Sequence, residues 1–336
     1  MAIITKTDRI RIYRAQYHSD MILLDLVKAR FSLKIDRTEQ KIADELFAIW
    51  QDNSRASINK NVGEMRKRGY SDAAIEEFLD ELQKDSGELA SGEKDEVFGL
   101  LMFSYEEKKK REAKKLKTDP SISAEEASRV EAVHNDQMYW FENNFRRNLR
   151  QRVKAAIKKA IKDTEDKSEA ETLKAVKDAV SREMSVIPGG TTTEDSGVAS
   201  PFAGRQKEWM QSNANTAVGR SLAFSSLQVF EDAELNEYRI DANAGRNSSE
   251  MCKYMNGRLF TLKQGQDLMD HIVGIKDYEE LLTDVPFWSV AAVIAATGIY
   301  QGEGLSSKDA AAALSKLGLA LPPYHHECGT GIRKSG

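Results

Sequence analysis

The chain has 336 residues, of which 40% are hydrophobic, 30% are charged and 8% are aromatic, with six prolines. This balance is typical of a helix-rich globular protein and excludes a largely disordered chain, and at about 150 residues per domain the length predicts two domains. The formal net charge of −4 indicates no class of partner, because it averages a basic stretch at 146–162 with an acidic region around 76–96.

The first residues, MAIITKTDRIRIYR, mix charged side chains among apolar ones from position 6 onward. A signal peptide needs an uninterrupted apolar stretch, so none is read here. The sequence therefore predicts a protein that folds in the cytoplasm.

From about 40 to 185 the signals are helical and the segments are long. The segment 71–82 has the spacing of an amphipathic helix, with Ser71 as its N-cap. Ser123 and Glu126 form a capping box, which predicts the start of one long helix. The region as a whole predicts a helical bundle or an elongated hairpin. The apolar stripe of the long helix is Met138, Phe141, Phe145, Leu149, Val153, Ile157 and Ile161.

The stretch 146–162 holds eight Lys or Arg and no acid. The favoured interpretation is the solvated face of an amphipathic helix, as it also is for the charged run 106–119. The alternative is a contact with nucleic acid or an acidic partner, which for nucleic acid would be a salt-dependent backbone contact without base stacking. The candidate contact residues are Arg146, Arg147, Arg150, Arg152, Lys154, Lys158, Lys159 and Lys162.

Residues 188–205 are rich in Gly, Ser and Thr, contain two prolines and show no hydrophobic period. Such a segment predicts a flexible linker. We therefore expect a helical region at 1–187 and a C-terminal module at 206–336. The fold class predicted is mainly α with a small α+β C-terminal module, that is, an elongated helical N-terminal region plus a compact domain clasped by Cys and His.

The C-terminal module begins with a helix at about 205–233 and a short strand at 236–243. In SSEMCKYMNGRLF (248–260), Asn256-Gly257 predicts a tight hairpin turn between two strands. The most apolar run, 285–300, is shorter than the roughly 20 residues that cross a membrane, so it predicts a buried helix.

The segment PPYHHECGT (322–330) gathers two His and one Cys in a chain with five His and two Cys. We expect Cys252, His325 and Cys328 to meet, and three interpretations stand open. They would hold Zn²⁺, form a structural clasp of buried thiols and histidine hydrogen bonds, or form a disulfide after release from the cell. The candidates for a fourth zinc ligand are His326, Asp241 and Glu250.

The order of these motifs resembles that of the phage Mu F-like minor head proteins, also called phage head morphogenesis proteins. Their C-terminal module combines a (T/S)-(C/S)-x-x-C segment, a (D/N)-G-(K/R)-x-(F/W) turn and a final P-P-x-H-x-x-C. The resemblance covers about 205–333, with 261–321 as an insertion, and departs from the family where Asn247 and Gly329 replace arginines. The matching residues are Ser248, Ser249, Cys252, Asn256, Gly257, Arg258, Phe260, Pro322, Pro323, His325 and Cys328.

The resemblance implies a minor capsid protein that binds the portal protein and capsid components without catalysing a reaction. It would take part in head assembly and in genome packaging or delivery, first in the host cytoplasm and then in the virion, in the head interior or at the portal vertex. It implies no membrane, and packaged DNA as the nucleic acid for the basic stretch 146–162. The alternative is a metal- or Cys/His-dependent hydrolase or toxin domain acting on nucleic acid or peptide.

Overall fold

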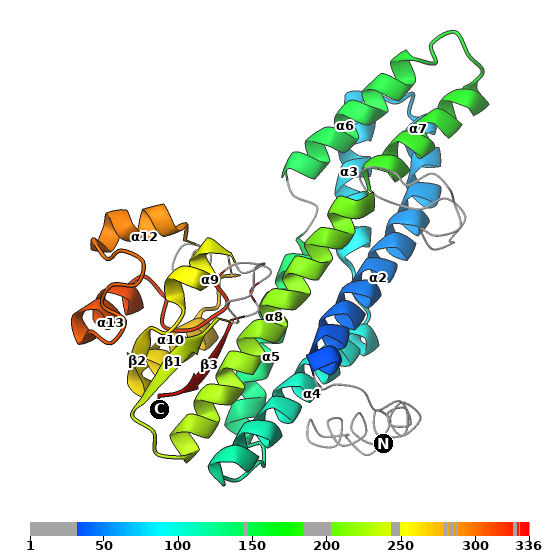
Figure 1. Ribbon diagram of the computed structural model, residues 1–336. Helices are drawn as coiled ribbons and strands as arrows, with labels where there is room; N and C mark the ends of the chain where they lie inside the picture. Colours follow the sequence, from blue (N-terminus) through cyan, green and yellow to red (C-terminus); the bar gives the residue numbers. More distant parts are fainter. Residues whose placement is uncertain are drawn as a thin grey trace, which may run out of the picture. The chain divides into compact units, whose positions relative to one another are not determined.

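A computed structural model describes residues 32–143, 147–184, 203–242, 249–278 and 288–324, with Leu281, Val285, Cys328 and 330–335. The fold is mainly helical and carries one small antiparallel sheet in its C-terminal part, which confirms the predicted fold class (Figure 1). The helices are α2 (Ser32–Lys67), α3 (Asp72–Gly87), α4 (Ser91–Leu116), α5 (Ala124–Glu142), α6 (Arg147–Lys162), α7 (Glu169–Glu183), α8 (Ala203–Asp232), α9 (Glu250–Met255), α10 (Leu262–Gly274), α12 (Val290–Thr297) and α13 (Lys308–Ser315). The strands are β1 (Glu237–Asp241), β2 (Leu259–Thr261) and β3 (Gly331–Lys334).

The described residues divide into two compact units, and each unit takes residues from both sides of the expected linker. Apart from its last three residues, which begin α8, the linker expected at 188–205 lies outside the described residues. The boundary expected there stays a prediction. The sheet-containing unit comprises 32–39, 95–137 and the described residues from 212 onward, and the helical unit comprises 40–94 and the described residues of 138–211.

The helical unit contains the amphipathic helices that the sequence predicts. Ser71 caps α3 by accepting a hydrogen bond from the Ala74 amide, as expected. Trp50, fully buried in α2, donates its indole N–H to the Met184 carbonyl at 3.1 Å and meets the edge of Phe141. A buried indole with its one donor satisfied anchors the core of this unit.

The prediction of a single long helix after Ser123 is wrong, because α5 ends at Glu142 and α6 begins at Arg147. The capping box at its start is confirmed, since Ser123 and Glu126 bond each other's backbone N–H. At its end, the Asn143 side chain donates to the Tyr139 carbonyl, the competition for backbone partners that disfavours Asn inside helices. Where the two helices separate, the end of α5 lies against Gly87, whose added Cβ would be 2.5 Å from the Glu142 oxygen.

In the sheet-containing unit, α8 is buried on more than one face. On one side, Phe224 and Phe230 are each 1% exposed. On the opposite side, Ser225 donates to the Tyr105 carbonyl of α4 at 3.0 Å. A helix packed on both sides needs no single apolar stripe, which explains its weak amphipathicity.

The sheet has the order β2-β1-β3, with both pairs antiparallel. The strand predicted at 236–243 is its central strand, β1. Tyr238 of β1 stacks on Phe260 of β2 and lies near Phe230 of α8, so this face of the sheet packs on the helix. The third strand, β3, pairs with the other side of β1, with Ile240 opposite Ile332.

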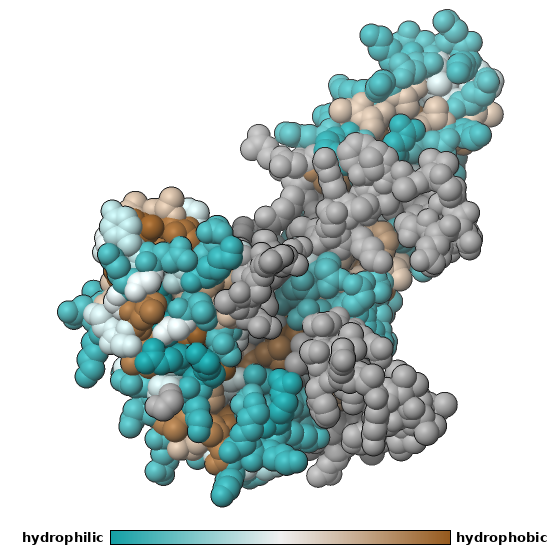
Figure 2. All heavy atoms as spheres, viewed as in Figure 1, coloured by the Kyte–Doolittle hydropathy of each residue, from teal (hydrophilic) through white to brown (hydrophobic). Residues whose placement is uncertain are grey.

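Two further expectations for this unit are corrected. The turn at Asn256-Gly257 follows the helix α9 and not a strand, because Ser249 caps that helix and four of its six residues are buried. In the described residues of the run 285–300, the helix is the two-turn α12, in which Val293 is buried while Ala291 and Ala295 are exposed. Apolar residues therefore reach the surface over α12 (Figure 2). Within the part of the chain that the structure describes, no helix is both long enough and apolar enough to cross a membrane.

Candidate functional site

The motif turn ties α9 to both neighbouring strands. Asn256 accepts a hydrogen bond from the Ala242 amide at 3.1 Å, which holds the end of β1. Gly257 has φ +79°, a conformation that L side chains rarely adopt, and its N–H donates to Ile240 of β1 at 2.9 Å. Backbone geometry thus requires the glycine, and Asn256 contributes its side-chain oxygen, although the turn joins a helix to a strand.

Arg258 is 1% exposed, which is unusual for an arginine. Its guanidinium donates to the carbonyls of Tyr254 and Glu303 at 3.0 Å and of Tyr300 at 3.3 Å, and it lies 4.2 Å from the centre of the Tyr254 ring. Carbonyl oxygens and a ring face compensate the buried charge. The motif arginine therefore fastens the turn at 300–303 to α9.

The Pro-Pro end of the final motif packs on the same core. The Pro322–Pro323 peptide bond is cis, and Pro323 lies against Gly219 of α8, where a Cβ would be 3.6 Å from its Cβ. Two residues before Pro322, the carbonyl of Ala320 accepts a hydrogen bond of 2.7 Å from the Tyr238 hydroxyl.

The structure brings Cys252 and Cys328 together, although 76 residues separate them in sequence, with their sulfurs 3.6 Å apart. Cys252 lies in α9 and is 4% exposed, while Cys328 is half-buried just before β3. The hydrogen bond with Cys252 and, after it, burial raise the pKa of the Cys328 thiol. Cys328 is therefore held as a neutral thiol at neutral pH, and neither cysteine is in a disulfide.

The expected partners of these cysteines lie only partly within the described residues. His325 and His326 fall outside them, as does the motif position Ser248. Of the other two zinc candidates, Asp241 is exposed and Glu250 is paired with Lys253.

The two sulfurs fit half of a zinc site. Thiolates bound at 2.3 Å to tetrahedral Zn²⁺ lie about 3.8 Å apart, close to the observed 3.6 Å. Among the residues that the structure describes, no three His, Cys, Asp or Glu side chains converge as a metal site. Zinc thus stays a prediction that depends on His325 and His326.

The basic stretch is largely engaged with acids of its own unit. Arg150 bridges Glu76 and Asp80 of α3 at 2.6 and 2.7 Å, and Lys154 also pairs with Glu76. The bonds from Lys154 and Arg150 lower the pKa of Glu76 to about 2. Further pairs join Arg152 to Glu183 and Lys158 to Asp72. The side chains of Arg146 and Arg147 lie outside the described residues, and the described Lys159 and Lys162 are not in these pairs.

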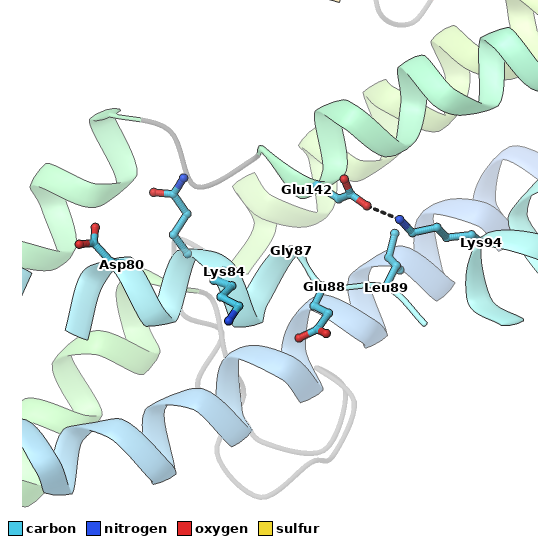
Figure 3. Close-up of a pocket in the computed structure, with 8 residues that line it drawn as sticks. Asp80, Lys84, Gly87, Glu88, Leu89, Lys94 and Glu142 are labelled. Atoms are coloured by element: carbon cyan, nitrogen blue, oxygen red, sulfur yellow. Dashed lines mark hydrogen bonds and ion pairs between the residues drawn. The ribbon is translucent and has the colours of Figure 1, made fainter. Parts of the chain in front are cut away.

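A hollow of about 550 Å³ lies beside the junction of α3 and α4, which the sequence did not predict (Figure 3). The Lys94–Glu142 ion pair lies at its edge. Its walls carry charges of both signs, so they select no one class of ligand. The lining residues are Asp80, Gln83, Lys84, Gly87, Glu88, Leu89, Lys94 and Glu142.

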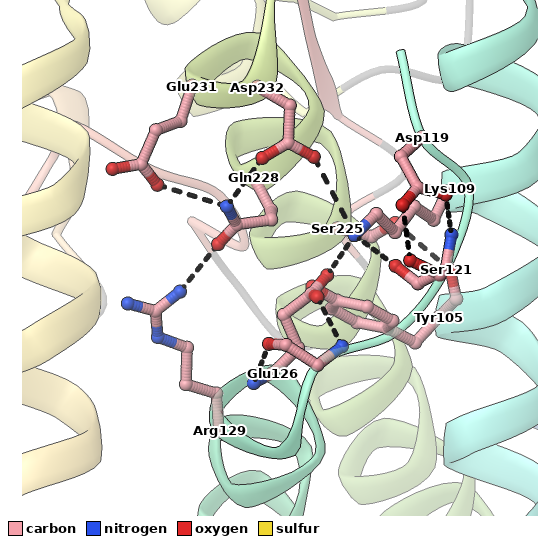
Figure 4. A network of polar contacts seen from close by, with 11 residues as sticks. Tyr105, Lys109, Asp119, Ser121, Glu126, Arg129, Ser225, Gln228, Glu231 and Asp232 are labelled. Carbon is pink, nitrogen blue, oxygen red and sulfur yellow. Dashed lines mark hydrogen bonds and ion pairs between the residues drawn. The ribbon is translucent and has the colours of Figure 1, made fainter.

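The charged run 106–119, expected to be solvated, contains a buried ion pair (Figure 4). Lys109, 3% exposed, donates to Glu126 and to the Ser121 carbonyl, each at 2.6 Å. Glu126 also accepts the Tyr105 hydroxyl hydrogen bond at 2.8 Å. Burial opposes the ionisation of Glu126, but these bonds outweigh it and lower its pKa. The expectation fails because the sequence around Lys109 is polar and gives no sign of burial. The acid that pairs with it, Glu126, lies 17 positions away in the chain.

Comparison of the chain with protein-family models, with curated proteins and with solved structures finds no match in any of the three.

Proposed function

We propose that this chain is a phage minor capsid protein of the head morphogenesis type, which associates with the portal and takes part in head assembly and in genome packaging or delivery. The observation that carries the proposal is the 3.6 Å contact between Cys252 and Cys328. These residues belong to the two halves of the motif that resembles the family. Their contact supports reading both halves as one module.

The other described motif positions support the same reading, because each has a packing role in that module. Ser249 caps α9, Asn256 and Gly257 bond the end of β1, and Arg258 and Phe260 are 1% exposed. A motif whose members build a core is typical of a structural protein, since a catalytic motif directs polar groups into a cleft. This favours binding over hydrolysis as the activity of the module.

The ion pairs of α6 bear on the choice of partner. With Arg150, Lys154 and Lys158 engaged by α3, fewer cations are left for packaged DNA. Portal and capsid proteins are therefore the partners we propose first. DNA contact would take a secondary, salt-dependent part.

The test is chemical cross-linking with mass spectrometry on the tagged protein in its host while particles assemble. We expect cross-links to the portal ring and the protein in purified particles. As a matched pair, Arg258→Ala should reduce incorporation, while Lys263→Ala, at an exposed ion pair of α10, should not. Absence from particles, together with hydrolysis of nucleic acid or peptide that His325→Ala abolishes in a folded protein, would establish the enzyme instead.

A further inference from the structure

We propose that Cys252 and Cys328 are an oxidation site, at which a disulfide oxidant of the glutathione class joins the two thiols and covalently closes the segment between them. The proposal rests on the geometry of the module and is independent of the proposed function. It selects one of the interpretations that the sequence leaves open and assigns each cysteine a separate role.

The distance between the sulfurs is short enough for the reaction. They lie 3.6 Å apart, and a disulfide requires about 2.05 Å, so the sulfurs must approach by roughly 1.5 Å. The two thiols already contact each other across elements that the sheet holds in register, since α9 leads into β2 and Cys328 precedes β3. Both strands pair with β1, which keeps the two cysteines near one another in the reduced protein.

Their unequal burial gives the reaction an order. Cys328 is half-buried and Cys252 is 4% exposed, so the oxidant reaches Cys328 first. Cys328, after losing its proton, attacks one sulfur of glutathione disulfide, forming a mixed disulfide and releasing one glutathione thiolate. Cys252, after losing its proton, attacks the Cys328 sulfur and releases the second. The protein loses two protons and two electrons, and one glutathione disulfide becomes two glutathiones.

The new bond would enclose β2, α10, α12 and α13 in one covalent loop. Without it, β3 is held by its pairing with β1 and by packing. The pool of reduced glutathione in a cytoplasm keeps such thiols reduced, and an oxidising environment favours the disulfide. The module would therefore gain stability when the protein leaves a reducing compartment.

The experiment incubates the folded full-length chain with glutathione disulfide and follows its intact mass. We expect the unsubstituted chain to lose two hydrogen atoms and keep no glutathione, with a melting temperature raised by roughly 5–15 °C. The Cys252→Ser variant should retain one glutathione on Cys328, because the resolving thiol is missing. The Cys328→Ser variant should react at least about tenfold more slowly, because its remaining thiol is buried.

The same chains unfolded in urea provide the control, since both single-Ser variants should then take up glutathione at similar rates. Circular dichroism verifies that each variant is folded before oxidation. Stable glutathione on both cysteines of the unsubstituted folded chain would overturn the proposal. So would equal rates for the two folded Ser variants, or no reaction of the folded chain.

Discussion

At the scale of single residues, Asn256 and Arg258 of the motif satisfy backbone N–H and C=O groups that would otherwise lack a hydrogen-bond partner. Arg258 is the clearest case, because its guanidinium serves three carbonyls from α9 and the turn that follows α12. A lysine has one donor group on a flexible stem and cannot reproduce this fork. The arginine is therefore a structural requirement of the module.

Arg258→Ala should lower the free energy of unfolding by about 2–4 kcal/mol, because it removes buried packing and leaves carbonyls without donors. Arg258→Lys should lower the free energy of unfolding by more than half as much as Arg258→Ala does. Urea denaturation followed by circular dichroism measures both. Arg239→Ala is the control, since Arg239 is half-buried and its two hydrogen bonds among the described residues go to the Gly257 carbonyl and Ser306; it should cost less than about 1 kcal/mol. Equal losses at the two arginines would contradict this account.

At the scale of elements, the helical unit is organised by complementary charge. The basic face of α6 meets acids of α3 and α7, so its cations serve helix packing. These pairs are largely exposed, and salt screens them. Their contribution should therefore be visible mainly through its dependence on pH and ionic strength.

The pKa of Glu76 is about 2 in the folded chain, against an ordinary 4.5. A lowered pKa stabilises the fold at pH above 4.5, and this stabilisation is lost as pH falls from 4.5 toward 2. Glu76→Gln should lower the melting temperature at pH 6 and flatten its fall below pH 4.5. Thermal melts at low salt measure this, with Glu81→Gln on the same helix as the control. Parallel curves for Glu76→Gln and the unsubstituted chain would refute the assignment.

At the scale of the whole molecule, each of the two units has a core of its own, and α2, α4, α5 and α8 contribute residues to both. In the sheet-containing unit, Lys109 connects α4 and α5 through Glu126. Removing one partner of a buried ion pair leaves an uncompensated charge, which costs about 3–5 kcal/mol. The loss should appear first in the unit that contains the pair.

Lys109→Met should raise amide hydrogen exchange at least about a hundredfold in β1, β2 and α8 beyond residue 212, with a smaller change in α3 and α6. Hydrogen exchange with mass spectrometry measures each segment. Lys110→Met is the control, because Lys110 is 45% exposed and pairs with Glu106 on its own helix. An equal rise in both units would show that they unfold together.

Much of the fold was predictable because its signals are local. Hydrophobic spacing and the cap Ser71 predicted α3, the helix expected at about 205–233 is α8, and the capping box at Ser123 and Glu126 is present as expected. The expectations that failed depend on distant residues. The break between α5 and α6 lies where Gly87 approaches Glu142, 55 positions away in the chain, and no local pattern near Asn143 shows that contact.

The sequence by itself determined the mainly helical class, the position of the central strand β1 and the residues of the Cys and His motif, because periodicity, capping and turn chemistry act over a few positions. Only the tertiary structure decided that Cys252 and Cys328 touch, that Arg258 and Lys109 are buried, and that the cations of α6 face acids of α3. Each of these facts joins residues far apart in the chain. Burial and charge pairing depend on which surfaces the fold brings together. A short stretch of sequence does not show which distant surface it will contact.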